Sequence, residues 1–195
     1  MLNYTLFSKT CNHLYFSGYG TSIEEENTNF LIPILNGDLQ DEADVKSDTF
    51  SVEKLFLRLG ESNNRLNIVI LDACRKYPKH GIKGLKNISP PRKSLIVYPA
   101  EPGKTVIFPK YGKKNSLYVE HLIEELEIAS NIYTKSQEVI DTFRKIRDKV
   151  QRESNMEQIP SIPSFSSREL QSYFCWNKKC PSRQRITPKQ LGTKD

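Results

Sequence analysis

A short apolar run at residues 68–71, rich in β-branched side chains, is the clearest structural signal in this chain. A polar cluster at residues 61–64 precedes it and a turn signal follows it, a pattern that predicts a strand over residues 67–71. Because apolar and polar positions do not alternate, we expect this strand to be buried on both faces, as in a parallel sheet covered by helices. Ligands bind beyond the carboxyl ends of such strands, and Asp72 and Cys74 stand at that end.

Hydropathy also predicts strands at residues 12–16, 30–34 and 95–98, and a helix at residues 52–59 for which Ser51 is a suitable N-cap. Two amphipathic helices are expected toward the C-terminus, the second beginning near residue 136. Their apolar stripes, which we interpret as core faces, are Leu117, Leu122, Ile123 and Leu126 in the first helix and Val139, Phe143, Ile146 and Val150 in the second. Alternating strands and helices indicate an α/β domain.

The remaining segments are predicted to be turns, loops and tails. Gly18 and Gly20 are expected to permit a tight turn after the first strand, and the acidic residues 38–48 to form an exposed loop. Residues 76–93, rich in lysine, glycine and proline, are expected to form a mobile, solvated loop. A final strand is predicted at residues 170–174. The chain is therefore divided into a short N-terminal segment (residues 1–11), one domain (residues 12–174) and a basic, disordered tail (residues 175–195).

Length and composition favour one domain with a substantial core, since the chain has 195 residues of which 37% are hydrophobic. No apolar run is long enough for a membrane span and no signal-peptide pattern is present, so we expect a cytoplasmic protein. The net charge is +6, but the basic residues lie in predicted loops and the tail, so nucleic-acid binding is not expected. The four cysteines lack metal-site spacing, and we expect neither a metal nor a cofactor.

Cys74 is the candidate nucleophile, although a lone cysteine at a strand end is more often a packed apolar side chain. Asp72 lies two residues earlier and Arg75 follows directly, so charged groups flank it. A second predicted strand ends in the sequence S-G-Y-G at residues 17–20. These neighbours favour a catalytic site at Cys74 over a packed thiol.

Four segments, in this order, resemble those of the caspase-like cysteine peptidases, in particular the bacterial and metacaspase-like branch. Residues 71–75 read L-D-A-C-R, similar to the nucleophile segment of that family, and residues 13–20 (H-L-Y-F-S-G-Y-G) resemble its strand ending in S-G-H-G. Residues 29–34 (N-F-L-I-P-I) and 94–103 (S-L-I-V-Y-P-A-E-P-G) are similar to its N-Y-L-I-P-V segment and its A-T-A-P-G loop. Similar order and spacing over most of the chain is more specific than any single motif.

The resemblance implies a three-layer sandwich with a mostly parallel central sheet, and a cysteine endopeptidase that acts on proteins or peptides. It implies that Cys74 is the nucleophile and that the backbone N–H groups of Cys74 and Gly20 bind the oxyanion. It also implies that Asp72 selects arginine or lysine before the scissile bond, because a carboxylate pairs with a guanidinium or ammonium group. The alternative for Asp72 is a strand-end carboxylate that caps a loop or pairs with Arg75.

Tyr19 stands at the position of the family's catalytic histidine. An imidazole can both accept and donate a proton near neutral pH, whereas a phenol cannot, so general acid–base help worth about 10²–10⁴ in rate is expected to be lost. His13 lies about 20 Å from residue 19 along an extended strand, and His121 is expected on a helix surface. Only His80, in the flexible segment after the nucleophile, is a candidate substitute base.

The family domain begins with a strand and helices upstream of the S-G-H-G motif, and the chain has few residues there. We therefore expect the strand from Asn12 to Phe16 to expose an edge at which a partner strand or a second copy pairs. Two functions follow: an impaired caspase-like endopeptidase, or an inactive pseudopeptidase that is a binding or regulatory module or a decayed fragment. A calcium site among residues 38–48 is not predicted, because the ligand pattern is missing.

Overall fold

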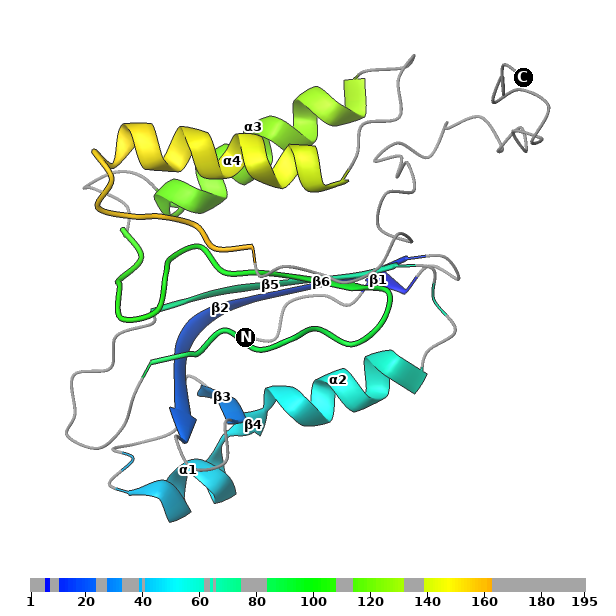
Figure 1. Cartoon of the computed structure of the whole chain (residues 1–195), viewed down its shortest axis with the longest axis vertical. Coiled ribbons are helices and arrows are strands. Elements are labelled where there is room, and N and C mark those ends of the chain that lie inside the picture. The colour runs from blue at the N-terminus through cyan, green and yellow to red at the C-terminus, as the bar shows by residue number, and fades with distance from the viewer. Residues whose placement is uncertain are drawn as a thin grey trace, which may run out of the picture.

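A β-sheet lies between two helical layers in the computed structural model of the chain (Figure 1). Helices α3 (Leu117–Asn131) and α4 (Val139–Glu153) cover one face, and α1 (Glu42–Asp48) and α2 (Val52–Glu61) lie on the other. This layered α/β arrangement confirms the predicted fold class. The residues that the structure describes are 6–7, 11–23, 28–32, 39, 41–61, 64, 66–74, 84–107, 114–131 and 139–162.

The sheet has the strand order β4-β3-β2-β5-β6, with β1 beside the start of β2. Its strands are β1 (Leu6–Phe7), β2 (Cys11–Ile23), β3 (Thr28–Ile32), β4 (Phe50–Ser51), β5 (Leu66–Cys74) and β6 (Ser94–Val97). β2, β5 and β6 run parallel, whereas β1, β3 and β4 pair antiparallel. The sheet is parallel only in part because a connection as short as that between β2 and β3 permits an antiparallel pair and no crossover.

Strand β5 forms the centre of the sheet, and all of its residues from Leu66 to Ala73 are buried. Because side chains alternate along a strand, Ile68 and Ile70 pack under α3 and α4, while Val69 and Leu71 pack against α2. The prediction of a strand buried on both faces is confirmed. Its carboxyl end carries the candidate site residues.

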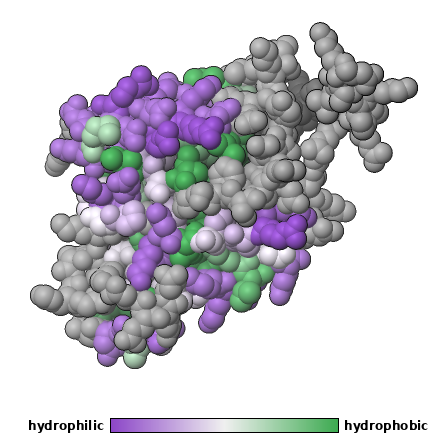
Figure 2. Space-filling model, viewed as in Figure 1, coloured by the Kyte–Doolittle hydropathy of each residue, from purple (hydrophilic) through white to green (hydrophobic). Residues whose placement is uncertain are grey.

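The helical predictions hold for α2 and α4 and fail at one position of α3. Ser51 caps α2, since its Oγ accepts a hydrogen bond from the Lys54 N–H at 3.3 Å. The four residues of the predicted α4 stripe are all buried. In α3, however, Ile123 is 42% exposed and Tyr118 is fully buried instead, because the helix turns this residue toward the sheet. Polar side chains gather on the outer surface of this helical layer (Figure 2).

The predicted turn at Gly18 and Gly20 is wrong, because β2 continues through both glycines to Ile23. Pairing of its last five residues with β3 extends the strand. Gly20 is required for a different reason: a Cβ there would lie 2.6, 2.7 and 2.8 Å from three side-chain atoms of Leu85. Leu85 is buried in the core between the sheet and α2. The glycine therefore permits close packing of the segment that follows β5.

Replacing Gly20 by alanine should destabilise the fold by about 1–3 kcal/mol, because the added methyl group overpacks the core at Leu85. Chemical denaturation measures the change. Gly60→Ala is the matched control: a Cβ at Gly60 meets nothing within 4 Å, and alanine in this helix should stabilise by about 0.5–1 kcal/mol. A Gly20→Ala chain as stable as the unaltered one would contradict the packing described.

Residues 84–93 form a loop, as predicted, but the loop is not solvated throughout. Leu85 and Ile88 in this segment are buried in the core. The Asn29 side chain also fixes its backbone, donating to the Lys86 carbonyl at 2.8 Å and accepting from the Lys86 N–H at 2.9 Å. Residues 75–83, the rest of the predicted loop, lie outside the described part of the chain.

The predicted exposed acidic loop is also wrong in part, because α1 forms within it. Asp41 is the N-cap, and its side chain accepts a hydrogen bond from the Asp44 N–H at 3.0 Å. Val45, the apolar residue on the inner side of this short helix, is buried with Leu39 and with Phe30 of β3. Two apolar side chains thus attach this polar segment to the core.

The edge of β2 that was predicted to be open, from Asn12 to Phe16, is partly covered. β1 pairs with Asn12 and His13, and β3 pairs from Tyr19 onward. Residues of the N-terminal segment, for which no element is predicted, thus supply one of the strands. The predicted strand at residues 170–174 and the tail fall outside the described residues. No helix in the described part is long and apolar enough to span a membrane.

Candidate active site

Tyr19 and Cys74 are register partners on neighbouring parallel strands. Their backbones therefore lie side by side at the carboxyl end of β5, with strands about 4.8 Å apart. Tyr19 is 60% exposed, so this position is open to solvent. Gly20 follows directly on β2, with Leu31 of β3 as its register partner. The sequence motifs that suggested a common site are thus brought together by the β2–β5 pairing.

Asp72 is buried two residues before Cys74, and two hydroxyl groups hold one of its oxygens. The Tyr15 OH donates a hydrogen bond to Asp72 Oδ2 at 2.8 Å, and the Ser116 Oγ donates to the same oxygen at 3.1 Å. Asp72 is only 5% exposed, and its Oδ1 is buried without a hydrogen-bond partner among the described residues. Arg75, the alternative partner considered for this carboxylate, lies outside that part of the chain.

Burial dominates the electrostatics of this carboxylate. It raises the pKa of Asp72, and the hydrogen bonds from Tyr15 and Ser116 offset part of the increase by favouring the charged form. Burial, followed by the charge of Asp72, also raises the pKa of Tyr15, so its phenol remains protonated and able to donate. A buried carboxylate at the end of a central strand costs free energy, which is typical of a functional position.

Strand alternation and a helix N-terminus explain how these groups meet. Tyr15 lies on the β2 face that packs against α3 and α4. Ser116 precedes α3 and caps it, because its Oγ also accepts from the Val119 N–H at 3.3 Å. Tyr118, fully buried in the first turn of α3, is close enough for the charges of Asp72 and Tyr15 to add to the burial that raises its pKa. Its hydroxyl has no hydrogen-bond partner in the described part of the structure.

The partners of Asp72 were not predicted from the sequence. Tyr15 could have been identified, because it shares the period-two face of Ser17 and Tyr19 on one strand. Ser116 shows an N-cap pattern before an amphipathic helix, but nothing in the pattern links it to a residue 44 positions away. Tyr118 lies outside the predicted apolar stripe, and its hydroxyl carries no sequence signal.

The histidines lie as the sequence predicts where the structure describes them. His13 is six residues from Tyr19 on one continuous strand, about 20 Å away, and burial lowers the pKa of its imidazole. His121 on α3 is held by two carboxylates, with Nδ1 3.2 Å from Glu124 Oε2 and Nε2 2.9 Å from Glu153 Oε2. His80 is outside the described residues. Within those residues, no cluster of three or more acidic, histidine or cysteine side chains could hold a metal.

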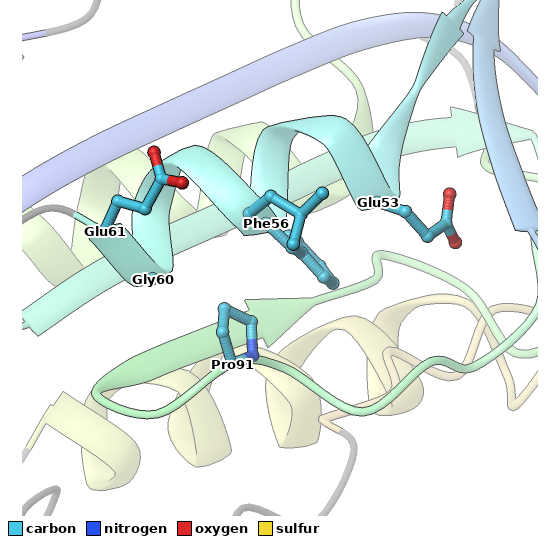
Figure 3. Close-up of a pocket in the computed structure, with 6 residues that line it drawn as sticks. Glu53, Phe56, Gly60, Glu61 and Pro91 are labelled. Carbon is cyan, nitrogen blue, oxygen red and sulfur yellow. The ribbon is translucent and has the colours of Figure 1, made fainter.

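A hollow of about 560 Å³ lies elsewhere, between α2 and Pro91 (Figure 3). Phe56 and Leu57 line it together with Gly60, and Glu53 and Glu61 stand at its margins. It belongs to the α2 side of the sheet, whereas Asp72 is held on the α3 side. The hollow is therefore separate from the candidate active site.

A family model described as the caspase domain matches residues 8–171. The match includes both strands of the site and the helix that Ser116 caps. A search of curated proteins finds no match.

Proposed function

The chain belongs to the caspase-domain family of peptidases, and from this premise we propose that it is a slow cysteine endopeptidase that cleaves after lysine or arginine. The observation that carries the proposal is the buried, hydroxyl-held carboxylate of Asp72 two residues before Cys74. A carboxylate kept in a desolvated site favours a cationic side chain over a neutral or acidic one.

In the proposed reaction, the Cys74 sulfur attacks the scissile carbonyl carbon and the peptide nitrogen leaves with a proton. Water then hydrolyses the thioester and restores the thiol. The backbone N–H groups of Cys74 and Gly20 are the proposed donors to the oxyanion. Asp72 binds the basic side chain before the scissile bond. Tyr19 is at the proposed position of the general base, and the lack of an imidazole there limits the rate.

Hydrolysis of fluorogenic peptides that end in lysine, arginine or aspartate tests this function directly. We expect slow cleavage after lysine and arginine, no cleavage after aspartate, and complete loss of activity in Cys74→Ala. Cleavage that survives in Cys74→Ala, or that favours aspartate, would contradict the proposal. Circular dichroism on each variant confirms that the chain is folded.

The second candidate function is a pseudopeptidase that binds peptides without cleaving them. The exposed Tyr19 beside Cys74 favours it, because this side chain replaces the base and leaves the Asp72 site unchanged. A pseudopeptidase would be silent in the hydrolysis assay but would still bind lysine-containing peptides, and it would lose this binding in Asp72→Asn.

A further inference from the structure

The two oxygens of the Asp72 carboxylate differ in their hydrogen-bond partners. Oδ2 accepts two hydrogen bonds, from the Tyr15 OH at 2.8 Å and the Ser116 Oγ at 3.1 Å. A carboxylate oxygen has two lone pairs, so these two donors use the acceptor capacity of Oδ2. Oδ1 accepts nothing from the described residues and is buried. Among the described residues, one oxygen is therefore left for a ligand.

This asymmetry distinguishes between the two basic side chains. Arginine gains its advantage over lysine from a planar fork of N–H groups that engages both oxygens of a carboxylate at once. A carboxylate that offers a single oxygen cannot complete this bidentate pair. Lysine has a compact ammonium group that needs only one acceptor. An unbonded buried acceptor is costly, and a single N–H donor would satisfy it.

We propose that Tyr15 and Ser116 are positioning residues that occupy one oxygen of Asp72 and leave the other to a single N–H donor, so that the site selects lysine over arginine. This inference rests on the proposed function and narrows its substrate class. The donors are well placed to persist when a ligand binds. Tyr15 is anchored in the sheet, and Ser116 is fixed by its second role as the cap of α3.

The test compares two peptidyl chloromethyl ketones that differ only in ending with lysine or arginine. Each alkylates a cysteine thiol irreversibly with loss of chloride, so no turnover is required. We define the selectivity ratio as the rate constant for Cys74 alkylation by the lysine reagent divided by that for the arginine reagent, measured on the full chain. Changes in thiol reactivity or in folded fraction cancel in this ratio, whereas a change in recognition does not.

The unaltered chain should show a selectivity ratio above one. Tyr15→Phe keeps the packing of the ring and frees a lone pair on Oδ2, so it should shift the ratio toward arginine by about tenfold. Ser116→Ala should shift it in the same direction, with some loss of stability from the lost helix cap. Tyr118→Phe is the matched control, since it removes a buried hydroxyl near the same carboxylate without a bond to it, and should leave the ratio within about twofold.

Each outcome decides between the alternatives. A ratio of one or less in the unaltered chain, or an unchanged ratio in Tyr15→Phe, overturns the inference while cleavage after basic residues can stand. A folded chain in which an aspartate-ended reagent reacts as fast as both basic reagents overturns the proposed function and this inference with it. A shift in Tyr118→Phe equal to that in Tyr15→Phe also contradicts the inference, because removal of any nearby hydroxyl would then suffice.

Discussion

Replacing Tyr19 by histidine should raise kcat/KM for lysine-ended peptides by about 10²–10⁴-fold, the contribution of a positioned general acid–base group. The residue is the register partner of Cys74, where the proposed reaction requires such a group. It is also 60% exposed, so an imidazole fits there without repacking the core. Steady-state hydrolysis by Tyr19→His and by the unaltered chain measures the gain.

Ser17→His is the matched control for that gain. Ser17 is exposed on the same strand, two residues before Tyr19, and its register partner is Asp72 instead of Cys74. The same imidazole placed about 6.6 Å along the strand should give no increase in rate. An equal gain in both variants, or no gain in a folded Tyr19→His chain, would contradict the assignment of residue 19 as the vacant base position.

Replacing Asp72 by asparagine should abolish recognition of basic peptides and, at neutral pH, stabilise the fold. Loss of a desolvated charge partner reduces kcat/KM for lysine-ended peptides by about 10²-fold or more.

The stabilisation follows from burial, which raises the pKa of Asp72 in the folded state. The folded chain prefers the protonated acid, so the unaltered protein loses stability as pH rises from the usual carboxyl range through this raised pKa. The Asp72→Asn protein does not lose stability in this way, because asparagine does not ionise.

Urea denaturation at several pH values measures this effect. The stability gained by Asp72→Asn should be small near pH 4 and larger at pH 7. Asp141→Asn is the control, because Asp141 is a surface acid paired with Arg144 at 3.1 Å and should change stability by no more than about 0.5 kcal/mol at either pH. An Asp72→Asn chain less stable than the unaltered one at pH 7 would show that the buried carboxylate serves the fold.

The central strand and the long helices could be predicted from sequence because one kind of signal determines each of them. Residues 68–71 are all apolar, which by itself predicts a buried strand. The apolar residues of α4 recur with a clear helical period. Two of the three antiparallel strands, β1 and β4, have no such signal. β1 and β4 are each two residues long, too short for any pattern to appear.

The failures at Gly20 and at residues 84–93 have a common cause. Glycine is expected in a turn, but Gly20 lies in a strand that pairs with β3. Glycine is needed there because Leu85, 65 residues later, fills the space that a Cβ would occupy. The lysines around Leu85 indicate a solvated loop, but the buried side chains of Leu85 and Ile88 hold it against the core. Two hydrogen bonds from the Asn29 side chain also fix its backbone. Both depend on a tertiary contact that no local pattern contains.

The sequence motifs identify the candidate residues of the site but not the donors that hold Asp72. Asp72, Cys74 and Tyr19 belong to contiguous motifs, and the β2–β5 register brings them together. The donors to Asp72 come from another strand and from the start of a helix. They are recognised only once the buried carboxylate has to be hydrogen-bonded.

Alkylation of the unaltered full chain by lysine-ended and aspartate-ended peptidyl chloromethyl ketones tests most directly whether Cys74 and Asp72 work as one site. Mass spectrometry identifies which of Cys11, Cys74, Cys175 and Cys180 is modified. The account predicts modification at Cys74, at least about tenfold faster with the lysine reagent, and loss of that preference in Asp72→Asn. Equal rates for the two reagents, or modification spread evenly over the four cysteines of the folded protein, would contradict it.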